Sequence, residues 1–390
     1  MDYFERLGAA LEDAWSERNR DEERFPAAAL EVLERMPPRQ AFDRAALLDH
    51  LLDPHRPVPL QLAPLGAFGQ PGFTVFHGHG FVVEVYHWLE SLSAIHDHPF
   101  CGAFTILDGF SVHARYELGP GAPLGGRARR VALRLAALEL LTVGAVVPFS
   151  LRAHPLVHAL VHVPVSSISM VVRTVRTEGY SRYLPPVVAL PMEGEAEPLG
   201  RQLALLDALA TAGDPSHPER LARVLARADF ELALRVLSAE WPRRTPAERQ
   251  ALLELLRPRL REQVELLPPV LDHALRLQHA TAVRESLRDP DLRLVAVALG
   301  YAERREQVLE LLRDHGVEPL ACLHRFVDEA GMFGAGEEAS TVIGHVLVEG
   351  GGPERALAEL RAAYGAEAIA AHEADVRSFC ETSLLAVLRT

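Results

Sequence analysis

Two histidines lie one residue apart in the stretch SAIHDHPFCGAFTILDG, residues 93–109. His96 and His98 flank Asp97. Because side chains alternate along a β-strand, the two imidazoles would point to one side of the strand and the carboxylate to the other. Two imidazoles on one side can hold a single ion, and imidazole suits iron, zinc, nickel and copper. The alternative is that both histidines only decorate a polar strand edge.

A third ligand is available from a later run, AHPLVHALVHV, which contains His154, His158 and His162. All three have the same strand parity, so alternation does not choose among them. Four residues of strand span about 13 Å, so only one of the three can reach an ion held by the first pair. We favour His158, which lies in the middle of the run. His154 precedes a proline and is expected in a turn, and His162 is expected behind the ligands or facing solvent.

The residues around these histidines predict a β-rich segment. Between about residues 58 and 190, short β-branched and aromatic runs such as FTVF, FVVEVYHWL and SISMVVRTV alternate with glycine and proline. Such runs at close spacing favour an all-β sandwich or barrel. The segment GPGAPLGG, residues 119–126, is expected to be a flexible loop between two strands.

Helical patterns flank the β-rich segment on both sides, with apolar residues at three- and four-residue spacing. Prolines and acidic residues at 185–198 indicate a linker. A HEAT-like stack is an alternative arrangement for the helices that follow it. We predict an α+β protein with three parts: an N-terminal helical segment (1–55), a central β-barrel (56–190) and an all-α C-terminal domain (196–390).

Composition narrows the class of protein. The chain has 390 residues, of which 48% are apolar, so it can bury a large core. The formal net charge of −13 argues against nonspecific binding to nucleic acid or to an anionic membrane, because both require a basic face. We therefore expect neither partner.

Cysteine usage and the N-terminal sequence suggest a location in the cell. The three cysteines are far apart and form no CxxC pair, which is typical of a reducing compartment without disulfides. The first residues lack a basic segment followed by an apolar stretch, so we expect no signal peptide. The sequence contains no run of about 18 apolar residues, so we expect no membrane span. A cytoplasmic location is the expectation.

The segment FVVEVYHWLESLSAIHDHPFCGAFTILDGF resembles the first signature of the cupin superfamily, and within it the cysteine dioxygenase-type thiol dioxygenases. The residues that match this pattern are Phe81, Trp88, Ile95–His98 and Gly109. The resemblance implies a cupin jelly-roll barrel over the β-rich segment. It also implies an Fe(II) site held by His96, His98 and His158. It covers about 100 residues and does not extend to the helical flanks.

Several departures from this family bear on the ligands and the substrate. Many cupins place a glutamate ligand four or five residues after the two histidines, where this chain has Gly102 and Ala103, so a three-histidine site is implied. The arginine that holds the substrate carboxylate in thiol dioxygenases is missing from FTVFHGHG. Their Ser-x-His-x-Tyr series corresponds here to SMVVR, residues 169–173. Cysteine is therefore a doubtful substrate, and Cys101 is expected to be a packed thiol.

Other residues have possible roles near the metal. Tyr86 is a candidate proton donor, because the matching strand lines the cavity in the related proteins. Arg173 stands where the family has its pocket tyrosine, and its guanidinium could clamp a carboxylate or phosphate; alternatively it reaches solvent from a strand end. His113 lies behind the ligands or on the surface. His77 and His79, in FHGHGF, are expected to face water in a turn.

These observations predict a mononuclear non-haem Fe(II) oxygenase or dioxygenase. Its substrates would be O2 and a small anionic molecule, thiol- or amino-acid-like, bound at open metal positions. Zn, Mn or Ni are alternative metals. Two other functions stay open: a metal-dependent isomerase or lyase without O2 chemistry, and a non-catalytic metal-binding cupin with a helical interaction scaffold. The helical flanks could cover the pocket or form a homodimer.

Overall fold

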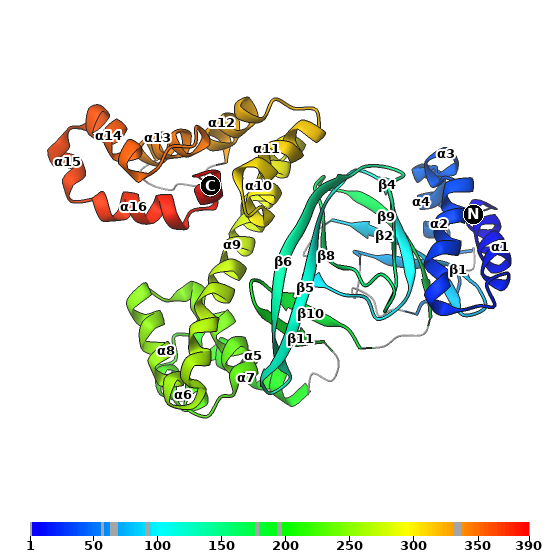
Figure 1. The fold of residues 1–390 in the computed structure, drawn as a ribbon, viewed down its shortest axis with the longest axis horizontal. Helices are drawn as coiled ribbons and strands as arrows, with labels where there is room; N and C mark the ends of the chain where they lie inside the picture. Colours follow the sequence, from blue (N-terminus) through cyan, green and yellow to red (C-terminus); the bar gives the residue numbers. More distant parts are fainter. Residues whose placement is uncertain are drawn as a thin grey trace.

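The structure is a computed structural model that describes residues 2–55, 58–62, 69–89, 94–175, 179–192, 197–330 and 337–389. Its centre is a β-structure with helices on both sides (Figure 1). The strands are β1 (Gly72–His77), β2 (Phe81–Trp88), β3 (Ile95–His96), β4 (Gly102–Asp108), β5 (Ser111–Gly125), β6 (Ala128–Leu141), β7 (Val146–Phe149), β8 (Val157–His162), β9 (Ser167–Thr174), β10 (Ser181–Leu184) and β11 (Val188–Pro191).

The strands form two antiparallel sheets. One is a five-stranded sheet in the order β1-β2-β9-β4-β7, and the other closes on itself as a barrel in the order β10-β11-β6-β5-β8-β3. Strands far apart in the chain are neighbours in both sheets, as in the β2–β9 and β5–β8 pairs. This closed barrel with flanking helices confirms the predicted α+β class.

Alternation along β8 shows how the sequence gives the barrel two different faces. Val157, Ala159 and Val161 lie in the hydrophobic core that the barrel shares with the C-terminal helices. His158 and His162 are also buried, but they belong to the opposite face of the strand. Because the outward residues are small or β-branched, helices can pack closely against the strand.

The N-terminal helices cover the five-stranded sheet. Leu7 and Leu11 of the first helix pack in one core with Phe25 of a later helix and with Phe81 and Val83 of β2. Complete burial of such a side chain stabilises the fold by roughly 1.5–3 kcal/mol. The helices of this layer are α1 (Asp2–Ser16), η1 (Glu22–Arg24), α2 (Phe25–Arg35), α3 (Pro38–Ala41) and α4 (Arg44–Leu52).

The remaining elements are helical. They are α5 (Glu197–Thr211), α6 (His217–Leu225), α7 (Phe230–Glu240), η2 (Trp241–Arg243), α8 (Pro246–Leu260), η3 (Arg261–Leu266), α9 (Leu267–Ser286), α10 (Pro290–Tyr301), α11 (Arg305–Asp314), α12 (Pro319–Glu329), α13 (Glu337–Val348), α14 (Pro353–Tyr364), α15 (Ala366–Ala370), α16 (Glu373–Thr382) and η4 (Leu384–Arg389). The long helix α9 runs between a group containing α5–α8 and a group containing α10–α16 (Figure 1).

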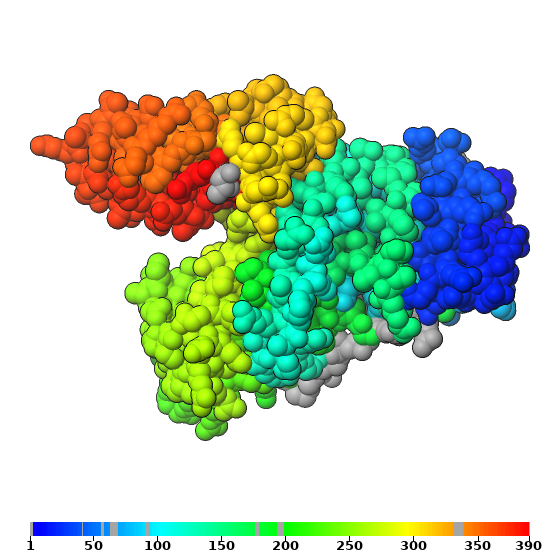
Figure 2. All heavy atoms as spheres, viewed as in Figure 1, coloured from blue at the N-terminus to red at the C-terminus, as the bar shows by residue number. Residues whose placement is uncertain are grey.

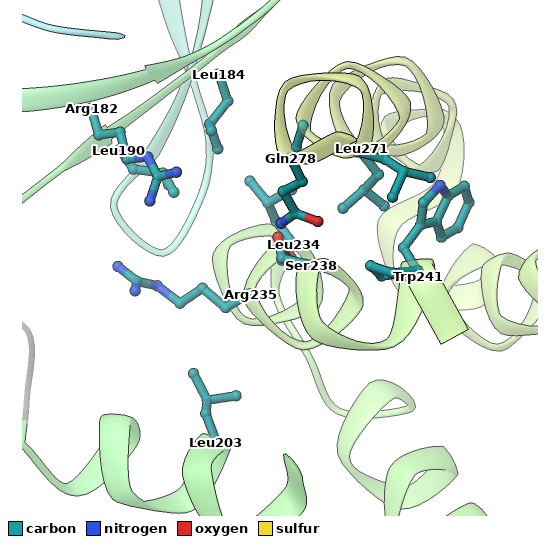
Figure 3. Close-up of a pocket in the computed structure, with 13 residues that line it drawn as sticks. Arg182, Leu184, Leu190, Leu203, Leu234, Arg235, Ser238, Trp241, Leu271 and Gln278 are labelled. Atoms are coloured by element: carbon teal, nitrogen blue, oxygen red, sulfur yellow. Dashed lines mark hydrogen bonds between the residues drawn. The ribbon is translucent and has the colours of Figure 1, made fainter. Parts of the chain in front are cut away.

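The two helical layers lie at opposite ends of the molecule, with the strands between them (Figure 2). A cavity of about 340 Å³ lies where β10 and β11 meet α5, α7 and α9 (Figure 3). Most of the residues that line it are apolar, with Arg182 and Arg235 on one side of it. Among the described residues, no helix is long and apolar enough to cross a bilayer.

Two expectations about local structure were wrong. Residues 119–126 are not a flexible loop, because β5 extends to Gly125 and β6 begins at Ala128. Register shifts between Leu118 and Gly121 and again near the tip absorb the glycines and prolines, as β-bulges do. Part of the expected linker at 185–198 is also a strand: β11 pairs with β10 and β6 and helps to close the barrel.

Candidate metal centre

Three histidine side chains converge inside the barrel. His96 on β3 is directly opposite His158 on β8, and His98 follows two residues after the first. One ligand nitrogen from each lies within 4.8 Å of the others, and the Nε2 atoms of His98 and His158 are 3.0 Å apart. Within the described part of the chain, no other three His, Cys, Asp or Glu side chains meet this spacing.

The other two histidines of the β8 run lie elsewhere. His154 is exposed in a bend before the strand. His162 is buried, its ring stacks on that of Trp88 with centroids 4.6 Å apart, and its Nδ1 is 2.8 Å from Ser111 Oγ. The geometry thus brings only His158 of the three to the first histidine pair.

Asp97 fixes the segment that carries the pair. One of its carboxylate oxygens accepts a hydrogen bond from the Ser181 backbone N–H at 2.6 Å, and the other accepts from the Tyr183 hydroxyl at 2.8 Å. Both donors belong to β10, whose Arg182 is opposite His96 in the sheet. The sequence argument placed Asp97 away from the metal but gave it no task; the structure shows it anchoring the two ligands beside it.

The three imidazoles are in a state that suits metal binding. Burial lowers the pKa of His96, and burial together with the neighbouring imidazoles holds the pKa of His98 and of His158 well below the usual value. All three are therefore neutral at pH 7, and a metal ion requires the neutral form. Three nitrogen donors of this kind fit a divalent transition metal.

Gly102 explains why the set lacks a carboxylate. A Cβ at this position would lie 2.3 Å from the backbone oxygen of Val172, so no side chain fits without moving β9. Ala103, next in the chain, packs with the apolar residues between the five-stranded sheet and the N-terminal helices. The positions at which many cupins carry a glutamate ligand are thus closed to one here.

Hydrogen bonds behind the ligands orient two of the rings. His96 Nδ1 lies 2.8 Å from the carbonyl oxygen of Ala94. Because a carbonyl only accepts, this Nδ1 carries the proton and Nε2 is left with its lone pair. His158 Nδ1 lies 2.9 Å from Nε2 of His113, which is fully buried. His113 therefore lies directly behind a ligand rather than on the surface.

Aromatic side chains line the site, and the sequence argument did not single them out. The Phe149 ring stacks on His98 with centroids 4.0 Å apart, and Phe104 lies 5.5 Å from His158. Phe100 is 5.6 Å from His98. An apolar wall of this kind strengthens electrostatic interactions with a bound ion by keeping water away.

Tyr86 and Arg173 meet at a third residue, Glu84. The Tyr86 hydroxyl donates to Glu84 Oε2 at 2.7 Å, and Arg173 donates through Nε and Nη2 to the two carboxylate oxygens at 2.6 and 3.0 Å. Arg173 is only 8% exposed, so it does not reach solvent from the strand end. Its guanidinium carbon lies 4.7 Å from the centre of the Phe100 ring.

These contacts set the protonation of both groups. Burial and the Glu84 charge raise the pKa of Tyr86, so the phenol keeps its proton. Burial lowers the pKa of Arg173, but Glu84 outweighs it, so the guanidinium stays charged. Because Glu84 occupies both arms of the guanidinium fork, Arg173 is part of an ion pair rather than a bare cation.

Cys101 and the second histidine pair are where the sequence predicted them. Cys101 is a buried free thiol, and burial raises its pKa to about 11. It therefore stays protonated and packs as a small apolar residue. His77 and His79 are exposed at the turn between β1 and β2.

No known protein family matches this sequence, and no curated protein sequence is similar to it. The closed antiparallel barrel and the cluster of His96, His98 and His158 are compatible with a metal-binding cupin.

Proposed function

We propose that this protein is a mononuclear non-haem Fe(II) oxygenase of the cupin type, similar to the thiol dioxygenases. The observation that carries the proposal is the convergence of three neutral imidazoles, two of them with Nε2 set to face a common point. A ferrous ion held there would supply redox chemistry with O2 and hold the substrate beside it.

The ion pair near the site favours a substrate of a particular kind. Glu84 and Arg173 present opposite charges side by side on the inner face of the five-stranded sheet. Any carboxylate that binds Arg173 must displace Glu84 from the guanidinium fork. A simple anion would leave the buried Glu84 carboxylate unpaired, whereas an amino-acid-like molecule offers a carboxylate to Arg173 and an ammonium group to Glu84. We therefore propose a small amino-acid-like substrate. When its ammonium group takes over Glu84, the protonated Tyr86 hydroxyl is released from that carboxylate and can donate to the substrate.

A second function has support from the same ligands. Three imidazoles without a carboxylate also suit Zn(II), which acts as a Lewis acid when such a site keeps an open position. Mn or Ni would serve a similar role. In that case the protein is an isomerase or lyase, and O2 takes no part.

The test separates these functions in two steps. We expect the purified protein to hold one metal ion per chain, and His158→Ala to lose it. His154→Ala is the matched control, because that histidine is exposed and outside the cluster. Fe(II) is then restored without oxygen, and O2 uptake is followed with a panel of small thiols and amino acids.

Substrate-dependent O2 uptake by the wild type, absent in His158→Ala, is the expected result. Stoichiometric metal without O2 uptake for any metal or substrate would favour the Lewis-acid function. Wild-type protein that binds no metal would contradict both and leave a barrel that serves as a scaffold.

A further inference from the structure

A line of polar groups runs from the third ligand toward the surface of the barrel. His158 Nδ1 is 2.9 Å from His113 Nε2, and His113 Nδ1 is 3.6 Å from Glu139 Oε2. His113 and Glu139 are directly opposite each other on β5 and β6. The line starts at a fully buried imidazole and ends at a carboxylate whose side chain is 41% exposed.

The carboxylate is held in place by an arginine on the same strand as His113. Arg115 donates to Glu139 Oε2 through Nε at 3.1 Å and to Oε1 through Nη2 at 2.5 Å. The neighbouring His113 imidazole and the Arg115 guanidinium outweigh partial burial and lower the pKa of Glu139 to about 2. Glu139 is therefore an ionised group that accepts hydrogen bonds and donates none.

Because Glu139 can only accept a hydrogen bond, it determines which ring nitrogen of His113, and then of His158, carries the hydrogen. His113 Nδ1 is buried and makes no hydrogen bond within 3.5 Å among the described residues. The Glu139 carboxylate, 3.6 Å away, is the charged group that it faces, so a proton on this nitrogen is favoured electrostatically. The neutral ring then has a lone pair on Nε2, which must receive a proton from His158 Nδ1. This leaves the lone pair of His158 on Nε2, the atom that lies 3.0 Å from His98 Nε2.

We infer that Glu139, acting through His113, is a positioning residue that fixes the tautomer of His158 and so presents its Nε2 to the metal. The inference rests on the proposed metal site. Glu139 also places a negative charge behind the three-histidine set. A carboxylate ligand in direct contact with the metal has no room at Gly102. Carboxylates that orient ligand imidazoles in this way usually strengthen metal binding.

The test compares two carboxylates of the same hairpin. Glu139→Gln removes the charge from the line. Glu117→Gln is the matched control, because Glu117 also pairs with an arginine across β5 and β6 but is 63% exposed and faces no histidine. Zn(II) and Co(II) affinities are measured by competition with a chelator, and 15N NMR of histidine-labelled, metal-free protein reports the tautomer of His158.

We expect Glu139→Gln to weaken metal binding by roughly 10- to 100-fold and to lose the single Nδ1–H tautomer of His158. Glu117→Gln should leave both unchanged. A Glu139→Gln protein that keeps wild-type affinity within twofold and the wild-type tautomer would overturn the inference. If the wild type binds no metal, the proposed function fails, but the tautomer in the metal-free protein still decides whether Glu139 sets it.

Discussion

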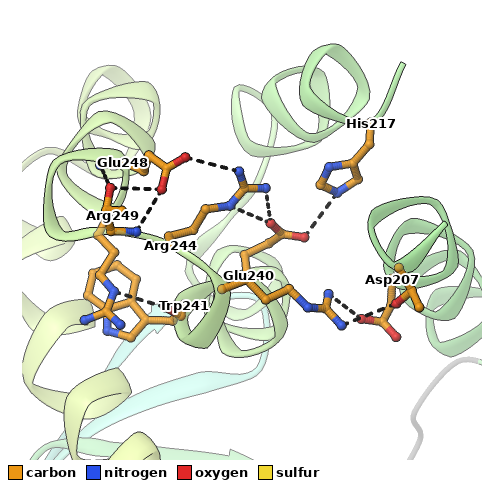
Figure 4. A network of polar contacts seen from close by, with 10 residues as sticks. Asp207, His217, Glu240, Trp241, Arg244, Glu248 and Arg249 are labelled. Carbon is orange, nitrogen blue, oxygen red and sulfur yellow. Dashed lines mark hydrogen bonds and ion pairs between the residues drawn. The ribbon is translucent and has the colours of Figure 1, made fainter. Parts of the chain in front are cut away.

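Buried histidines occur in two different surroundings in this molecule. In the helical region, His217 Nε2 lies 3.1 Å from Glu240 Oε1, and Arg244 contacts the same carboxylate (Figure 4). In the barrel, His96, His98 and His158 face one another. A carboxylate completes the first group, whereas a positive ion would complete the second.

The difference teaches how to separate a structural histidine from a ligand. A histidine beside a buried carboxylate already has the partner that makes its burial tolerable. The three neutral imidazoles of the barrel meet without an opposite charge among them, because the contact between Nε2 of His98 and Nε2 of His158 joins two neutral rings. Burial alone therefore does not identify a metal ligand, but the type of group that the imidazole faces does.

The largest expected effect is on metal affinity, when a histidine of the barrel site is replaced and a histidine of the helical site serves as the comparison. His158→Ala should reduce metal affinity by more than the roughly 10- to 100-fold that follows loss of a group behind a ligand, because two imidazoles remain in place of three. His217→Ala should leave metal stoichiometry unchanged. Elemental analysis after gel filtration measures both. Equal loss of metal in the two variants would show that the contrast between the sites is not real.

The helical site should respond in folding rather than in metal content. Glu240→Gln keeps the shape of the side chain but removes the charge that His217 and Arg244 share. Loss of one partner from a buried charged group costs about 3 kcal/mol. Denaturant unfolding should show a decrease of that size with no change in metal content. An unchanged midpoint would mean that this network carries little stability.

The buried histidines of the barrel should also make folding stability depend on pH. Burial lowers the pKa of His162 to about 3, whereas the unfolded chain should titrate near 6.5. Between these pH values the unfolded state binds more protons than the folded state. The contribution of His162 to the free energy of unfolding is therefore fully present above about pH 6.5 and is lost as the pH decreases toward 3. One such group contributes roughly 1.4 kcal/mol per pH unit in this window.

Unfolding of metal-free protein at pH 7, 6 and 5 measures this slope. His162→Phe, which can keep the stack on Trp88, should have a shallower slope. His79→Gln is the control, because that histidine is exposed in a turn and lies outside the barrel core. A wild-type slope in the Phe variant would assign the pH response to other groups.

The smallest effect is expected at an exposed ion pair in the same helix as His217. Arg223 and Glu219 are one helical turn apart on α6, and both side chains are about two-thirds exposed. Such pairs contribute about 0.3–0.5 kcal/mol. Arg223→Ala should therefore change the unfolding free energy by less than the Glu240 variant, and by less still in high salt. A larger change would mean that exposed pairs also support this region.

The parts of the site that obey strand alternation could be predicted from the sequence. His96 and His98 have the spacing of two ligands on one strand, but β3 ends at His96 and His98 lies after it. The later run supplied the third histidine, although only the structure distinguishes His158 from its two neighbours of equal parity. The β-rich centre and helical flanks followed from hydrophobic periodicity, which is a local property.

The groups that support the ligands could not be predicted, because their contacts join distant residues. Nothing near Glu139 in the sequence indicates that it faces His113 across a hairpin. Asp97 looked like a residue turned away from the ion, and its partners on β10 lie more than 80 residues later. The full length of the β5–β6 hairpin could not be predicted for another reason. Glycine and proline are typical of loops, but β-bulges allow these strands to continue through them.

The same hairpin connects the ligand support to the helices. Near its base it carries His113, and about 40 Å farther along, at its tip, the Arg127 backbone N–H donates to Glu231 of α7 at 2.8 Å. Paired strands resist bending where their hydrogen-bond ladder is continuous, and the register shifts of this hairpin are the places where it bends most easily. A tilt of α7 would therefore shift the hairpin, and with it the His113 ring that contacts His158.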